Sequence, residues 1–79
     1  MDLKLYVGPT CPYCMMVKQF IQKSGRTDVQ FLDIAEDEEN LKTLVKVGGR
    51  QQVPCLFIDG KPMYESRDII SWLEANPQK

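Results

Sequence analysis

The sequence predicts an α/β fold in which four strands form one mixed sheet, in the chain order strand, helix, strand, helix, strand, strand, helix. Two observations predict it. Strand-like and helix-like apolar patterns alternate along the N-terminal part of the chain, and an Asp-Gly pair then indicates a hairpin that is followed by a last amphipathic segment. A right-handed crossover through the first helix makes the first two strands parallel, whereas the hairpin strands are antiparallel.

The first strand and helix follow directly from residue order. Residues 3–7 alternate apolar and polar side chains, which is typical of a strand, and a Gly-Pro pair ends them. Thr10 is expected to cap the following helix, which has Cys11 and Pro12 in its first turn. Apolar residues at helical spacing extend this helix to Ser24.

A second strand and helix come next. Residues 29–34 have the apolar centre of a strand. Asp37 is expected to cap a helix whose apolar face ends at Gly48 and Gly49, and glycine is the usual residue at a helix C-terminus.

The next segment predicts an antiparallel hairpin. Residues 55–58 form a short apolar run, and Asp59-Gly60 is one of the strongest two-residue turn signals. The returning strand, which Met63 and Tyr64 complete, contains Pro62. Because Pro62 cannot donate a ladder hydrogen bond, this strand is expected at the sheet edge.

A last helix closes the pattern. Ser66 is expected to cap it, and Asn76 and Pro77 to end it. Its apolar residues follow helical spacing, at Ile69, Ile70, Trp72 and Leu73.

Length and composition limit what the chain does. The 79 residues, 43% of them hydrophobic, suffice for a single domain over residues 1–79, which we expect to be a monomer. A net charge of -1 gives no bias towards nucleic acid or a membrane surface, and no apolar run has the length of a membrane span. Three cysteines and no histidine fit neither a disulfide-stapled secreted domain nor a zinc site, so we expect a cytoplasmic protein without a metal.

The strongest signal is the Cys-x-x-Cys pair, Cys11 and Cys14, at the junction of the first strand and helix. This spacing places the second thiol about one helical turn from the first, so that a short-loop, exchangeable disulfide is possible. With no histidine to act as base, the positive end of the helix is the expected source of activation for a Cys11 thiolate. We expect Cys11 to be the nucleophile and Cys14 the resolving thiol. A pair of inert buried thiols, or half of a metal site, stays open on spacing alone.

The motif Cys11-Pro12-Tyr13-Cys14, together with Val53-Pro54, resembles the glutaredoxins of the thioredoxin-like superfamily. The resemblance implies a thioredoxin-like fold, a cis peptide bond before Pro54, and a thiol-disulfide oxidoreductase. It also implies glutathione as reducing cosubstrate and disulfide-containing proteins as substrates.

The same resemblance implies a glutathione site. Tyr13 would flank the tripeptide, and the backbone beside Val53 and Pro54 would pair with it as an added strand does. Glu65-Ser66 is similar to the stretch with which glutathione-transferase N-terminal domains hold the γ-glutamyl end. Ser66 would then meet the carboxylate and Glu65 the ammonium group.

Three positions depart from the family pattern: Gly8 stands where many members have Lys, Gln52 where they have Thr, and Arg67 where they have Asp. These three departures leave open an alternative function: a redoxin that is reduced by a flavin disulfide reductase of the thioredoxin-reductase type. An iron-sulfur module bridged between two chains is a further alternative, against which Pro12 argues. Cys55 is expected to be a buried core residue, with a third redox thiol as the alternative if its side chain faces the cleft.

Overall fold

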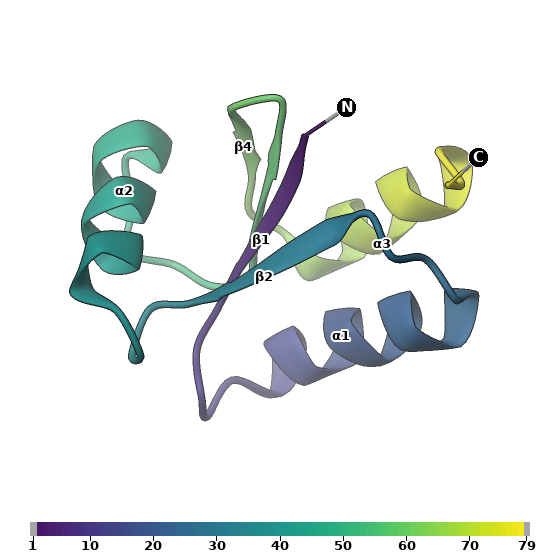
Figure 1. Ribbon diagram of the computed structural model, residues 1–79, viewed down its shortest axis with the longest axis horizontal. Coiled ribbons are helices and arrows are strands. Elements are labelled where there is room, and N and C mark those ends of the chain that lie inside the picture. The colour runs from purple at the N-terminus through teal and green to yellow at the C-terminus, as the bar shows by residue number, and fades with distance from the viewer. Residues whose placement is uncertain (1, 79) are drawn as a thin grey trace.

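The computed structural model describes residues 2–78, and its elements follow one another in the predicted order (Figure 1). They are β1 (Leu3–Val7), α1 (Pro12–Ser24), β2 (Val29–Asp33), α2 (Glu38–Gly48), β3 (Cys55–Ile58), β4 (Lys61–Met63) and α3 (Ser66–Ala75). The second strand is one residue shorter than expected, because Ile34 lies beyond β2. Tyr64 lies beyond β4, which corrects the prediction that it completes that strand.

One mixed sheet holds the four strands in the spatial order β2-β1-β3-β4. β1 pairs in parallel with β2, and antiparallel with β3, while β3 and β4 form the antiparallel hairpin. The predicted mixed sheet is therefore confirmed. Pro62 of β4 lies opposite Phe57 of β3, and β4 is an edge strand as predicted.

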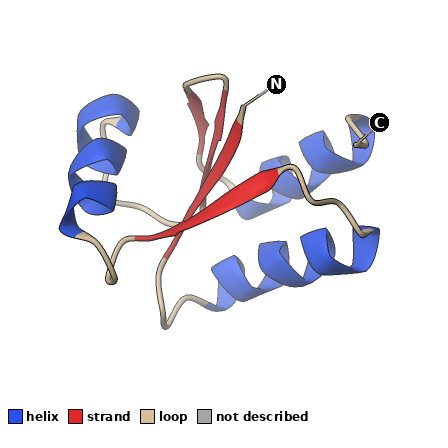
Figure 2. Ribbon diagram, viewed as in Figure 1, coloured by secondary structure: helices blue, strands red, loops and turns tan. Residues whose placement is uncertain are grey.

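The two faces of the sheet carry different helices, α1 and α3 on one and α2 on the other (Figure 2). Side chains alternate between the faces along each strand. The core under α1 and α3 consists of Leu3, Leu5, Val7, Cys14, Val17, Ile21, Leu56, Ile69 and Leu73. The core under α2 is smaller and consists of Tyr6, Leu44, Cys55, Phe57 and Tyr64.

The hairpin turn adopts the conformation that its sequence favours. Asp59 and Gly60 both have positive φ, at 50° and 87°. Positive φ at both central residues is the requirement of a type I′ turn, whose twist matches that of the flanking strands.

The ends of α2 agree with the sequence. The Asp37 side chain accepts a hydrogen bond from the N–H of Glu39 at 2.9 Å, as an N-cap does. At the other end Gly49 has φ 88° and donates its N–H to the carbonyl of Val45. No helix within residues 2–78 combines the length and apolar character needed to cross a membrane.

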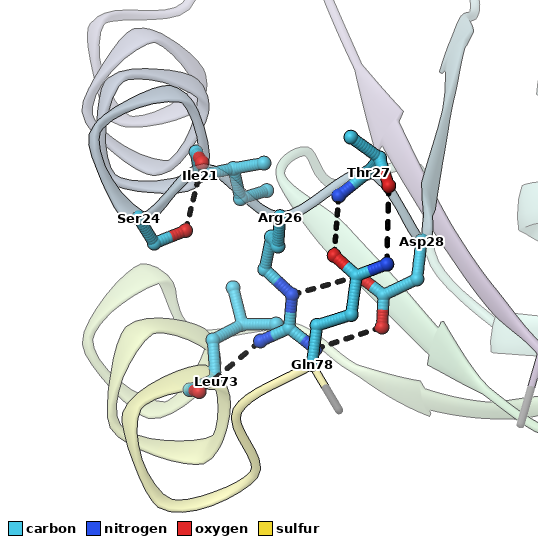
Figure 3. Close-up of polar contacts among 7 residues, drawn as sticks. All are labelled: Ile21, Ser24, Arg26, Thr27, Asp28, Leu73 and Gln78. Atoms are coloured by element: carbon cyan, nitrogen blue, oxygen red, sulfur yellow. Dashed lines mark hydrogen bonds and ion pairs between the residues drawn. The ribbon is translucent and has the colours of Figure 1, made fainter.

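A polar clamp joins the α1–β2 connection to the C-terminal end of α3 (Figure 3). The Arg26 side chain, only 4% exposed, donates two hydrogen bonds to the Asp28 carboxylate at 2.8 and 2.9 Å and a third to the carbonyl of Leu73 at 3.1 Å. Gln78 pairs with the backbone and hydroxyl of Thr27 beside it. The clamp lies at the C-terminal ends of α1 and α3, away from the cysteine pair at the start of α1.

Candidate active site

Cys11 occupies the N-cap of α1, directly after the loop that leaves β1. Its backbone is extended, at φ −102° and ψ 109°, and Pro12 is the first helical residue. The predicted cap at Thr10 is therefore wrong, since Thr10 lies in the preceding turn and the Cys11 side chain takes the capping role. Cys11 Sγ accepts a hydrogen bond from the N–H of Cys14 at 3.3 Å. A sulfur in this place meets the positive end of the helix, which stabilises negative charge on it.

Cys14 is buried in the core under α1 and α3, one turn into the helix. Burial, together with a hydrogen bond to the Cys11 side chain, raises the pKa of the Cys14 thiol to about 12. At neutral pH Cys14 is thus a protonated thiol. The two cysteines are chemically unequal, one half-exposed at the helix start and one buried beneath it; both are free thiols here.

The Val53–Pro54 bond is cis, as the family resemblance implied. Val53 lies against the start of α1, where the Cys11 thiol donates a hydrogen bond from Sγ to the Val53 carbonyl oxygen at 3.6 Å. Gly8 also lies close to Val53, since a Cβ at Gly8 would be 3.3 Å from Val53 Cγ2. A side chain in place of Gly8 would therefore require Val53 to shift.

A cleft of about 690 Å³ lies beside the cysteine pair. All five residues that sequence reasoning assigned to a glutathione site line it, namely Tyr13, Val53, Pro54, Glu65 and Ser66. Tyr13 is 59% exposed at its rim, so the ring is accessible from solvent. Cleft residues drawn from the start of α1, from the loop before β3 and from the start of α3 are therefore brought together in space.

Four further residues line the cleft without having been assigned to it. Gln52 and Arg67 were recognised only as departures from the family pattern. Met16 and Tyr64 carried signals that were not used: Met16 follows Tyr13 by three residues and so shares its helix face, and Tyr64 immediately precedes Glu65. Arg67 places a positive charge beside Glu65 on the α3 wall.

The start of α3 differs from its prediction. Glu65 occupies the N-cap, with no capping hydrogen bond from its side chain, and Ser66 is the first helical residue. The prediction that Ser66 caps the helix is wrong, because the chain turns helical one residue earlier than a serine cap requires. The first intrahelical bond runs from the N–H of Ile69 to the carbonyl of Glu65, so the preceding N–H groups of this turn have no helical partner.

The third cysteine lies apart from this site. Cys55 is fully buried on the α2 face of the sheet, opposite to the face that holds Cys14. Burial raises the pKa of Cys55 to about 11. The interpretation of Cys55 as a core residue agrees with this placement. Within residues 2–78 no three His, Cys, Asp or Glu side chains are grouped as metal ligands.

Comparison with known sequences gives the same family as the motif. The family model described as glutaredoxin matches residues 3–63. A glutaredoxin of Neisseria meningitidis serogroup A is 30% identical over 54 residues, covering 68% of this chain and 64% of that protein, less than two thirds of its length. Glutaredoxin 3 of Escherichia coli is 32% identical over 60 residues, covering 76% of this chain and 71% of that protein.

Comparison of structures gives the fold. The crystal structure of the thioredoxin-like protein BC3987 superposes with a TM-score of 0.79 at 23% identity, covering 94% of this chain and 97% of that one. The fold is therefore thioredoxin-like, as expected from the resemblance. With the matched family model and the relatives above, the chain belongs to the glutaredoxin family.

Proposed function

We propose that the protein is a glutathione-dependent thiol-disulfide oxidoreductase, with Cys11 as nucleophile and Cys14 as resolving thiol. The observation that carries this proposal is the position of Cys11 Sγ, which accepts the Cys14 N–H at 3.3 Å at the N-terminus of α1 and lies beside the cleft. This hydrogen bond and the helix dipole both stabilise a thiolate, so no histidine base is needed. Cys11 is partly exposed whereas Cys14 is buried, so Cys11 is the cysteine of the pair that a substrate disulfide can reach.

With a glutathionylated protein as substrate, the Cys11 thiolate attacks the glutathione sulfur. A disulfide forms between Cys11 and glutathione, and the substrate sulfur leaves and takes a proton from solvent. A second glutathione thiolate then attacks the glutathione sulfur of this mixed disulfide. Glutathione disulfide leaves and Cys11 returns as thiolate. One free glutathione has been consumed per substrate thiol released, since the other half of the glutathione disulfide is the glutathione that the substrate carried.

With a protein disulfide as substrate, Cys14 completes the reaction. Cys11 first forms a mixed disulfide with the substrate, and one substrate thiol leaves. Cys14 then loses its proton and attacks Cys11 Sγ, which releases the second substrate thiol and closes a Cys11–Cys14 disulfide. Two glutathione molecules reduce this disulfide in two successive exchanges. Because the Cys14 pKa is about 12, this closing step requires deprotonation of a buried thiol.

The cleft offers the groups that glutathione requires. Glu65 supplies a carboxylate for the γ-glutamyl ammonium group, and Ser66 supplies its hydroxyl and the free N–H groups of the α3 start for the adjacent carboxylate. The backbone at Val53 pairs with the cysteinyl part beside Cys11, and the Tyr13 ring flanks it. We further propose that the protein works as a monomer in the reducing cytoplasm, where both cysteines are kept as thiols.

The test is turnover of a mixed disulfide of glutathione and 2-mercaptoethanol, coupled to glutathione reductase and NADPH, with wild type, Cys11→Ser and Cys14→Ser. We expect Cys11→Ser to fall to the background rate and Cys14→Ser to stay active, because the second glutathione replaces the resolving thiol. Insulin reduction should be lost in both variants. Activity in Cys11→Ser would refute the nucleophile assignment.

The electron donor is tested with the same protein. The oxidised wild type is incubated with NADPH and either glutathione plus glutathione reductase, or a flavin disulfide reductase of the thioredoxin-reductase type. The proposal requires the first pair to reduce it. Reduction by the flavoenzyme alone would contradict glutathione dependence and favour the redoxin alternative.

A further inference from the structure

Tyr64 connects the wall of the cleft to the loop in front of the cis proline. Its side chain is 9% exposed in the core under α2, and it also lines the cleft. Its hydroxyl accepts a hydrogen bond from the N–H of Arg50 at 3.2 Å and donates one to the carbonyl of Arg50 at 3.0 Å. One side chain thus satisfies both backbone groups of a residue 14 positions earlier in the chain.

Two further contacts fix the same ring. The guanidinium carbon of Arg50 lies 4.2 Å from the ring centroid, within the range of a cation–π interaction. In addition, a Cβ at Gly48 would overlap the Tyr64 hydroxyl and lie 3.1 Å from Tyr64 Cζ. Gly48 is helical and has no positive φ, so it is the space taken by the hydroxyl that requires glycine there.

The loop that Tyr64 holds is anchored at its far end by Val53, which packs against both cores, and by the buried Pro54, but residues 50–52 have few contacts of their own. Residues 49–54, which we term the proline loop, lie between α2 and β3 and contain neither helix nor strand. In the part of the chain that the structure describes, residues 50–52 make no hydrogen bonds other than those to Tyr64. The loop nevertheless carries Gln52, Val53 and Pro54 into the cleft and the Val53 carbonyl to Cys11.

We propose that Tyr64 is a positioning residue for thiol substrates: its hydroxyl, held against Gly48, fixes the proline loop at the geometry in which the cleft binds. This inference rests on the proposed function for the identity of the substrate. Loss of the hydroxyl frees the backbone of Arg50 while the ring and its packing stay. Substrate binding therefore weakens more than the exchange step at Cys11, because the start of α1, and not residues 50–52, activates the Cys11 sulfur.

The experiment compares Tyr64→Phe, Gly48→Ala and the double variant with a matched control, Tyr6→Phe. Tyr6 belongs to the same core and is 3% exposed, but among the described residues its hydroxyl makes no hydrogen bond to the proline loop. KM and kcat are measured with the glutathione mixed disulfide. Amide hydrogen exchange of Arg50 is measured separately, as a readout that needs no activity, and urea unfolding shows that each variant is folded.

We expect Tyr64→Phe to raise KM about three- to tenfold, because both hydrogen bonds between the hydroxyl and Arg50 are lost, with kcat within about twofold of wild type. Arg50 exchange should become faster, and Tyr6→Phe should change neither quantity. Gly48→Ala should raise KM in the wild-type background but much less in the Tyr64→Phe background, because the overlapping hydroxyl is then gone.

Three results would overturn the inference. The first is an unchanged KM in Tyr64→Phe. The second is that Tyr6→Phe and Tyr64→Phe change KM and kcat by the same factors. The third is that the effects of Gly48→Ala and Tyr64→Phe on KM are strictly additive in the double variant. If the wild type does not use the glutathione substrate, the proposed function fails by that observation alone. The same KM and kcat comparison is then made with insulin, and it decides the role of Tyr64 by the same criteria.

Discussion

Replacing Asp28 by Asn removes one charge from the clamp that joins the α1–β2 connection to α3, with little change in shape. Arg26 loses the carboxylate to which it donates two of its three hydrogen bonds, and its side chain is only 4% exposed. An unpartnered buried charge costs about 3–5 kcal/mol. Because Asp28 is 29% exposed and water reaches it, we expect Asp28→Asn to lower the free energy of unfolding by only about 2–3 kcal/mol, which is close to the cost of losing a hydrogen bond to a charged group.

The assay is thermal and urea unfolding followed by circular dichroism. For a domain of this size, a loss of 2–3 kcal/mol lowers Tm by about 10–20 °C. Glu39→Gln is the control, since Glu39 and Lys42 form a pair at 3.6 Å whose side chains are 76% and 69% exposed. An exposed pair contributes about 0–1 kcal/mol, so Tm should change by only a few degrees. Equal and small losses in the two variants would refute the assigned role of the clamp.

The pH dependence of the same variant gives an independent check. The hydrogen bond from Arg26 lowers the pKa of Asp28 below its ordinary value. A carboxyl group whose pKa is lower in the folded than in the unfolded state stabilises the fold at pH values above its unfolded-state pKa of about 3.9. This contribution is lost as the pH falls through the folded-state pKa. The stability difference between wild type and Asp28→Asn should therefore be constant from about pH 5 to 8 and shrink below about pH 4.

Three further outcomes are expected. The rate at which the Cys11–Cys14 disulfide closes should rise with pH between about 6 and 9. Because the pKa of Cys14 is about 12, the thiolate fraction of Cys14 increases about tenfold per pH unit in this range. Stopped-flow release of the substrate thiol measures this rate, and a rate independent of pH would count against the mechanism. Cys55→Ala should lower stability by about 1–2 kcal/mol in urea and leave turnover within about twofold, whereas a large loss of turnover would point to a third redox thiol. Glu65→Gln should raise KM for the glutathione substrate about five- to tenfold, while Glu74→Gln, which is on the same helix but does not line the cleft, should leave it unchanged.

Local patterns predicted the order of elements correctly because each depends on neighbouring residues. The Asp59-Gly60 turn needs two positive φ angles, which an Asp-Gly pair adopts readily. The end of α2 at Gly49 follows from the same preference of glycine for positive φ. The cleft residues on three segments were assigned through resemblance to a family, and the structure places them side by side.

The helix starts show where local patterns fail. Thr10 and Ser66 are good capping residues by type, yet the caps are Cys11 and Glu65. The capping residue is the last one with extended backbone, and that depends on how the preceding loop enters the helix. In α1 this difference matters for the proposed function, because it puts the sulfur that we propose as nucleophile at the N-cap.

Long-range polar contacts left no signal in the sequence. Arg26 donates to the carbonyl of Leu73, 47 residues away, and Tyr64 pairs with the backbone of Arg50. A backbone carbonyl has no residue type that identifies it as a partner, and both contacts depend on the packing of α3 and the proline loop. Such contacts become predictable only once the elements are placed.

The central claim is that Cys11 is the thiol that exchanges with glutathione in this cleft. The most direct measurement is mass spectrometry of Cys14→Ser after incubation with glutathione disulfide, followed by peptide mapping. The Cys14→Ser change prevents release of the adduct by the buried thiol, so the mixed disulfide accumulates. We predict a single glutathione on the peptide that contains Cys11 and none on Cys55. An adduct on Cys55, or none at all under conditions that glutathionylate an exposed model thiol, would contradict the assignment.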